Sequence, residues 1–211
     1  MSPILLVSFL VAVIAPGEGA VLRLPPVDRC SSDDSFVAFR AELHQILVRR
    51  NPDQVLAIVS DDIMVNFGGG AGREEFARAW TLDVPETSRL WHALSEALRL
   101  GCIPGEDGTY WAPSLFQEEG IDDPFSVALA IHPGASLHQA ADEASPVVAT
   151  LNWDLVTVPE WNFEAAWQRV EMADGRTGYV QSTDLRSPVD HRAGFRKIDG
   201  RWRMITFIAG D

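Results

Sequence analysis

The stretch that decides the fold is WQRVEMADGRTGYV, residues 167–180. Two runs of alternating apolar and polar residues flank the pair Asp174-Gly175. Asp-Gly is a strong signal for a two-residue hairpin turn, because both central residues of a type I′ turn need a positive φ. The stretch therefore predicts two antiparallel strands joined by a tight turn.

The neighbouring sequence continues this pattern toward the N-terminus. Short runs separated by turn residues occupy 133–137, 146–151 and 155–158, and the last two are rich in β-branched residues. Strands at such regular short spacing are typical of a compact barrel or sandwich. We therefore predict a small all-β barrel over residues 125–187.

This region resembles a bacterial Src-homology-3-like domain. The likeness rests on Trp167-x-x-Val170 followed by Asp174-Gly175-Arg176-x-Gly178-Tyr179-Val180. Two departures stand out: Leu137-His138-Gln139-Ala140 replaces the usual opening strand, and the loop 159–164 is longer than a plain turn needs. The resemblance implies a module that holds cell-wall polymers or partner proteins in the bacterial envelope, without naming the ligand.

Aromatic residues are the best candidates for a binding site in this barrel. Trp167 and Tyr179 occupy strand positions that either pack the interior or line a groove, and core packing is the favoured role of Trp167. Trp161 and Phe163 are large apolar groups in a polar loop, where they either tuck under the loop or face a partner. We expect Trp161, Phe163, Trp167 and Tyr179 to bind the ligand, with Arg176 at the rim.

The rest of the chain predicts an α+β domain that the barrel interrupts. Apolar periodicity and capping residues indicate helices at 36–47, from Pro52, at 73–80 and at 88–100, and a strand at 63–67. The acidic segment 103–124 reads as a loop-rich lid. The terminal hairpin at 191–208 is expected to return to the sheet of the N-terminal half, because the barrel is complete before it begins.

This order of elements is similar to the cone-shaped nuclear transport factor 2-like fold. Phe67-Gly68-Gly69, Phe76, Trp80 and Gly200-x-Trp202 carry the likeness. The predicted fold class is thus a helix-plus-curved-antiparallel-sheet domain (30–124 plus 188–211) interrupted by a Src-homology-3-like barrel (125–187).

The first 20 residues are expected to be a signal peptide. The apolar run at 4–15 is shorter than the about 20 residues that span a bilayer, and small residues follow it. No other run reaches membrane length, so we expect an exported chain, periplasmic or secreted, without a membrane span. In such a chain Cys30 and Cys102 are expected to form a disulfide, the alternative being two buried thiols.

The net charge and the motifs limit the partners and the kinds of site that the sequence predicts. The net charge of −13 disfavours nucleic acid as a partner. The basic segment 186–203 is interpreted as a solvent face paired to acidic loops, or alternatively as a patch for an anionic polymer. The five histidines do not have the spacing of a metal site, and no motif for a catalytic residue or a cofactor is present.

Two functions follow from the sequence. The first is an exported, non-catalytic envelope protein whose barrel binds peptidoglycan or a protein partner. The alternative is an enzyme or small-molecule binder that uses a carboxylate-lined cavity in the cone-like domain, with Asp62 and Asp211 as the first candidates.

Overall fold

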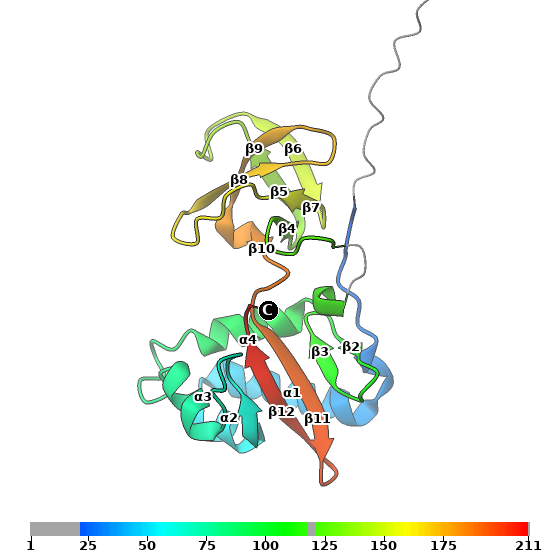
Figure 1. Cartoon of the computed structure of the whole chain (residues 1–211), viewed down its shortest axis with the longest axis vertical. Helices are drawn as coiled ribbons and strands as arrows, with labels where there is room; N and C mark the ends of the chain where they lie inside the picture. Colours follow the sequence, from blue (N-terminus) through cyan, green and yellow to red (C-terminus); the bar gives the residue numbers. More distant parts are fainter. Residues whose placement is uncertain (1–21, 118–120, 211) are drawn as a thin grey trace, which may run out of the picture.

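A computed structural model of the chain describes residues 22–117 and 121–210. The chain forms two lobes, one built on helices and a sheet and one built on strands (Figure 1). The expected signal peptide (1–20) and Asp211 lie outside the described residues. None of the described helices combines the length and apolar character needed to cross a membrane.

Four α-helices belong to the first lobe, and all four were predicted. They are α1 (Asp34–Arg49), α2 (Pro52–Ile58), α3 (Arg73–Ala79) and α4 (Leu90–Arg99). The Asp33 carboxylate caps α1 by accepting from the backbone N–H groups of Ser35 and Phe36. Gly101 ends α4 with a φ of +84°, the left-handed conformation that glycine adopts without a steric cost.

A mixed five-stranded sheet covers these helices. Its order is β1 (Val59–Met64), β12 (Arg201–Ile208), β11 (Arg192–Ile198), β3 (Tyr110–Ala112) and β2 (Ile103–Pro104). The hairpin β11–β12 pairs with β3 on one side and lies parallel to β1 on the other. The prediction that the terminal hairpin returns to the sheet of the N-terminal half is therefore confirmed.

The sequence predicted an antiparallel sheet in this lobe, but β1 pairs parallel to β12, so the sheet is mixed. Two further sequence predictions in this lobe were wrong. The first strand begins at Val59 rather than Ile63, because α2 passes directly into a strand whose first residue pairs with Met204. The segment 103–124 is not only a loop, since β2 and β3 form the edge of the sheet. Tyr110 explains this second error: its ring packs 4.8 Å from that of Phe36 and 4.7 Å from that of Trp202, so tertiary contacts override the polar surroundings of the segment.

The second lobe is an antiparallel seven-stranded sheet. Its order is β10 (Leu185–Arg186), β4 (Val127–Ala130), β7 (Leu155–Thr157), β8 (Trp167–Glu171), β9 (Thr177–Gln181), β5 (Pro133–His138) and β6 (Val147–Asn152). Within the described residues no ladder joins the edge strands β10 and β6, so the predicted closed barrel is not observed. The strands nevertheless surround one apolar core, to which Leu137, Val156, Val170 and Val180 contribute.

The lobes are joined by an apolar cluster and by the chain before α1. Leu100 and Leu115 of the first lobe pack with Leu129 and Ile131 of the second. The segment 22–29 pairs with the strand lobe near Trp153 and then with Cys102 of the helical lobe. Since the same short segment is bonded to both lobes, it restrains their relative position.

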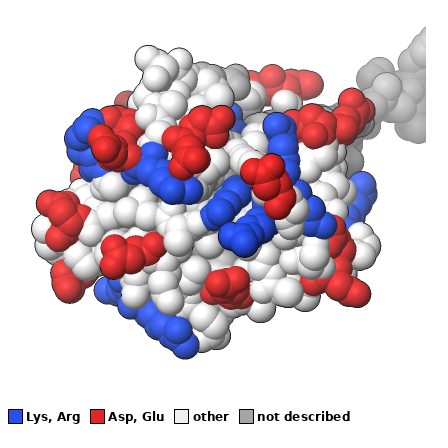
Figure 2. Space-filling view, turned by 90° about the horizontal axis from the view of Figure 1, so that it is seen from below, with Lys and Arg blue, Asp and Glu red and all other residues white. Residues whose placement is uncertain are grey.

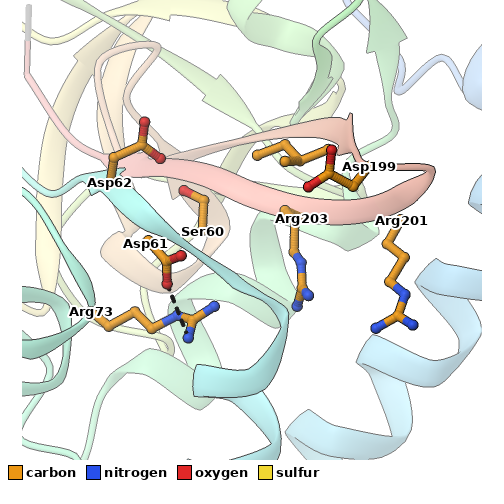
Figure 3. Close-up of a pocket in the computed structure, with 8 residues that line it drawn as sticks. Ser60, Asp61, Asp62, Arg73, Asp199, Arg201 and Arg203 are labelled. Carbon is orange, nitrogen blue, oxygen red and sulfur yellow. Dashed lines mark ion pairs between the residues drawn. The ribbon is translucent and has the colours of Figure 1, made fainter.

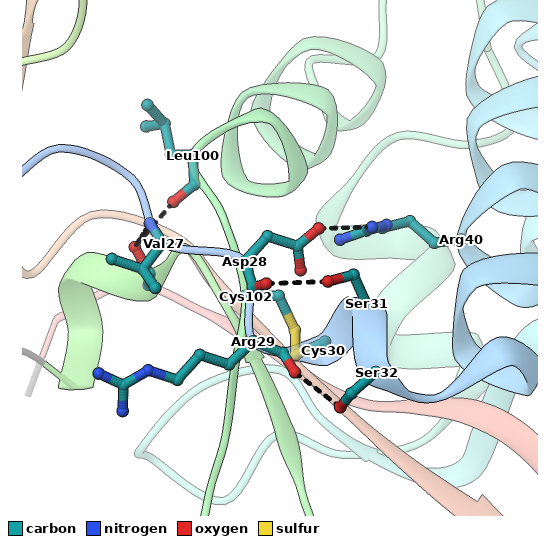
Figure 4. Close-up of a disulfide and its surroundings, with 10 residues drawn as sticks. Val27, Asp28, Arg29, Cys30, Ser31, Ser32, Arg40, Leu100 and Cys102 are labelled. Carbon is teal, nitrogen blue, oxygen red and sulfur yellow. Dashed lines mark hydrogen bonds and ion pairs between the residues drawn. A yellow bond between two sulfur atoms is a disulfide. The ribbon is translucent and has the colours of Figure 1, made fainter.

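Cys30 and Cys102 form the predicted disulfide, which is confirmed (Figure 4). Both half-cystines are buried in the core of the helical lobe. Around them the Arg29 N–H donates to the Cys102 carbonyl at 2.8 Å, and the Cys102 N–H donates to the Val27 carbonyl at 2.9 Å. The bond therefore links the chain entering α1 to the chain leaving α4.

Candidate functional site

The most apolar groove of the strand lobe lies where this lobe meets the residues that follow β12. It has a volume of about 440 Å³. The residues that matter for its chemistry are Phe125, Trp161, Phe163 and Gln168 of the strand lobe, with Val189 and Asp190 of the chain between the lobes. We call this cavity the aromatic groove.

Trp161 and Phe163 form a stacked pair in the groove. Their ring centroids are 5.4 Å apart and the ring planes differ by 2°. Trp161 packs against the core of the strand lobe, whereas the Phe163 residue is 79% exposed. Phe125, also exposed, lines the same groove. A large ring held in solvent on a second ring is a surface that another molecule can cover with a gain in apolar burial.

A buried glutamine holds the loop that carries this pair. The Gln168 side chain donates to the Asn162 carbonyl at 2.6 Å and accepts from the Asn162 N–H at 3.1 Å. Ser182 Oγ adds a hydrogen bond to the Ala165 carbonyl at 2.6 Å. Since Asn162 stands between the two aromatic residues, these bonds hold the loop in one conformation, and ligand binding then loses less conformational entropy.

The indole of Trp161 has an unused donor. Its Nε1 is buried and has no hydrogen-bond partner among the described residues. An unsatisfied buried donor costs on the order of 1–3 kcal/mol. A ligand acceptor that reached this N–H would recover part of that free energy.

The other predicted site residues lie elsewhere on the lobe. Trp167 and Tyr179 alternate with buried neighbours on β8 and β9, so both are on the outer face of the sheet. The expectation that Trp167 packs in the core is wrong, because Gln168 takes the inward position. Trp167 instead packs edge-on against His138, with ring centroids 5.3 Å apart.

Arg176 stands at the tip of the β8–β9 hairpin and does not line the groove. Its guanidinium group pairs with the Asp174 carboxylate at 2.6 Å. The structure therefore brings together Trp161 and Phe163 of the five predicted residues, and adds Phe125, which the sequence analysis missed. An exposed phenylalanine just before a strand was the only available signal.

A separate cavity, which we call the histidine cavity, is lined by three of the five histidines. His92, His132 and His191 line a space of about 670 Å³ between α4 and β10. His132 pairs with Asp184 at 3.0 Å, and His191 with Asp190 at 3.1 Å. Within residues 22–117 and 121–210, no group of His, Cys, Asp and Glu is arranged to hold a metal ion.

Asp190 and Arg186 form the charged centre of this junction. Burial raises the pKa of the Asp190 carboxyl, but hydrogen bonds from His191 and the charge of Arg186 outweigh it and lower the pKa to about 2. Burial lowers the pKa of Arg186, and the nearby Asp190 charge opposes this. Asp190 is thus a carboxylate whose oxygens are already used by the protein.

Two basic residues of the terminal hairpin pair with acidic loops, in line with one of the two sequence interpretations. Arg196 pairs with Asp107, and Lys197 pairs with Asp33 at 3.3 Å. Figure 2 shows Lys and Arg side chains intermixed with Asp and Glu over this end of the molecule. Arg201 and Arg203 of the same hairpin line a pocket together with Arg73 and three aspartates.

Asp62, one of the two carboxylates proposed for an enzyme, lines an open pocket, whereas Asp211 lies outside the described residues. Asp62 shares this pocket with Asp61 and with three arginines, Arg73, Arg201 and Arg203 (Figure 3). Asp61 is exposed and pairs with Arg73 at 3.1 Å. Asp61 and Asp62 are both exposed, on a surface that also carries three arginines.

Comparison of the chain with family models, with curated proteins and with solved structures gave no match. The aromatic groove is therefore the main structural indication of the function.

Proposed function

We propose that this protein is an exported, non-catalytic binding protein of the bacterial cell envelope, and that its aromatic groove binds peptidoglycan. The observation that carries the proposal is the exposed Phe163 ring stacked on Trp161 in a braced loop. The apolar faces of sugar rings pack well on such aromatic surfaces.

The proposed location is supported by the disulfide. Disulfides persist in oxidising compartments such as the periplasm and the cell exterior, and Cys30–Cys102 is buried in the core. The apolar run at 4–15 is the sequence pattern expected of an exported chain. Export itself is part of the proposal.

The proposed domain division is supported by sheet membership. Every strand of the seven-stranded sheet lies within 127–186, and every strand of the five-stranded sheet lies before 113 or after 191. We propose that the first is an open variant of the Src-homology-3-like fold and that the second, with its helices, is cone-like. The boundaries 125–187, and 30–124 plus 188–211, follow this division.

Phe163→Ala is expected to weaken retention on peptidoglycan about tenfold, because it removes an aromatic contact of the kind that dominates binding surfaces. The measurement is co-sedimentation of the whole purified protein with insoluble peptidoglycan at moderate salt. Since Phe163 is largely exposed, the substitution should leave the free energy of unfolding within about 0.5 kcal/mol of its original value.

Val48→Ala is the matched control, because Val48 is an exposed apolar residue on α1 outside the groove. It should not change retention. If the original protein stays in the supernatant, or if both variants lose retention equally, the wall-binding proposal is wrong and the groove serves another partner, such as an envelope protein.

A further inference from the structure

The aromatic groove opens toward a second pocket that belongs to the helical lobe. This pocket has a volume of about 590 Å³ and is lined by Trp80, Arg89, His92, His191 and Phe207. Phe163 and Asp190 line both cavities. The Phe163 ring therefore stands at the passage from one cavity to the other, and a ligand on it can contact both lobes.

Three rings form the wall of the second pocket. Trp80 stacks on Phe207, with centroids 5.0 Å apart and planes 28° apart. The His191 ring lies 4.9 Å from Trp80 and 5.3 Å from Phe207. The 3.1 Å contact between His191 Nδ1 and the Asp190 carboxylate orients the imidazole within this group, so the wall is preformed.

The charged side chain of the second pocket that has no ion pair within the described residues is a cation. Arg89, the residue before α4, is exposed and has no ion pair among the described residues. His92 follows one turn later on the same helix, also exposed. The only carboxylate lining the pocket is that of Asp190, which is engaged by Arg186 and His191. A ligand group that enters here meets an unpaired cation beside an aromatic wall.

We infer that the second pocket binds a carboxylate-bearing peptide branch of the ligand whose sugar portion lies in the aromatic groove. The inference rests on the proposed function and adds the part of the ligand that the helical lobe recognises. Arg89 forms the charge-assisted contact to the carboxylate, and the Trp80–His191–Phe207 wall packs against the branch. The ligand is then a glycan unit with its acidic peptide attached, and not a bare sugar chain.

The test compares two ligands and two variants by isothermal titration calorimetry with the whole protein. The ligands are a soluble disaccharide–peptide fragment of peptidoglycan and the same fragment with its carboxylates converted to amides. Amidation keeps the shape and removes the charge. Arg89→Gln is compared with Arg49→Gln, since Arg49 is an exposed arginine on α1 that lines none of the cavities described above.

Arg89→Gln is expected to weaken binding of the free-acid fragment about fivefold, the size of a partly exposed ion pair. Amidation should weaken binding to the original protein by a similar factor and should have no further effect on the Arg89→Gln variant. Arg49→Gln should bind like the original protein.

The titrations distinguish failure of this inference from failure of the proposed function. If the fragment binds, Phe163→Ala weakens both of its forms equally, and neither amidation nor Arg89→Gln changes affinity, the inference is overturned while the proposed function stands. If neither form binds the original protein, both are overturned.

Discussion

Replacement of both Cys30 and Cys102 by alanine is expected to lower the free energy of unfolding by about 4 kcal/mol. The two residues are 72 positions apart, so the bond removes many conformations from the unfolded chain, and long loops gain most in the chain-entropy model. Alanine is the right replacement because both positions are buried, where a serine hydroxyl would add its own cost.

Urea unfolding monitored by tryptophan fluorescence measures this loss. The original protein unfolded in the presence of reductant should match the double variant, because both lack the same bond. A loss below about 1 kcal/mol, well under the 2–5 kcal/mol usual for a native disulfide, would contradict the account of the helical lobe.

Gly178→Val is expected to cost about 3 kcal/mol of stability, at the upper end for an overpacked site. A Cβ atom at Gly178 would stand 2.4 Å from the His138 carbonyl oxygen and 2.9 Å from the Leu137 side chain. The oxygen belongs to the backbone of β5, so the clash cannot be relieved by a side-chain rotation. β9 would have to move away from β5, which opens the sheet.

Thr177→Val is the matched control, one residue earlier on the same strand and exposed. It should change the free energy of unfolding by less than about 0.5 kcal/mol. Equal stability of the two variants in urea unfolding would show that β9 and β5 do not approach as closely as described.

Gly178 shows what the sequence could and could not reveal. The run Gly178-Tyr179-Val180 was sufficient to predict a strand after the Asp174-Gly175 turn, and that strand is present as β9. The reason for the glycine is a contact with a strand about 40 residues earlier, and no local pattern contains that contact. Local signals also gave the helices, through side-chain caps at Asp33 and Asn51 and through the apolar periodicity of α1 and α4.

Errors arose where tertiary contacts decide which way a residue points. Gln168 faces the core because the Asn162 backbone satisfies its amide, and this turns Trp167 outward. From the sequence alone, the tryptophan is the natural choice for the inward position. In β3, the half-buried Tyr110 packs against Phe36 and Trp202, although the residues that precede it, 105–109, are glycine-rich and acidic.

Only the part of the candidate site that lies within one loop could be predicted from the sequence. Trp161 and Phe163 stand two residues apart in an unusual loop, so the sequence itself draws attention to them. Trp80, Arg89 and His191 come from three separated segments, and only the fold of the helical lobe places them around one pocket. A cavity of this kind can be recognised only after folding.

The most direct test of the central claim is the NMR signal of the Trp161 indole N–H during titration with the disaccharide–peptide fragment. The chain has seven tryptophans, so each indole signal can be assigned by single substitution. We predict that the Trp161 signal moves most, because the ligand covers the Trp161–Phe163 stack in the groove. Saturable binding that leaves this signal in place, with larger shifts at Trp167 or elsewhere, would contradict it.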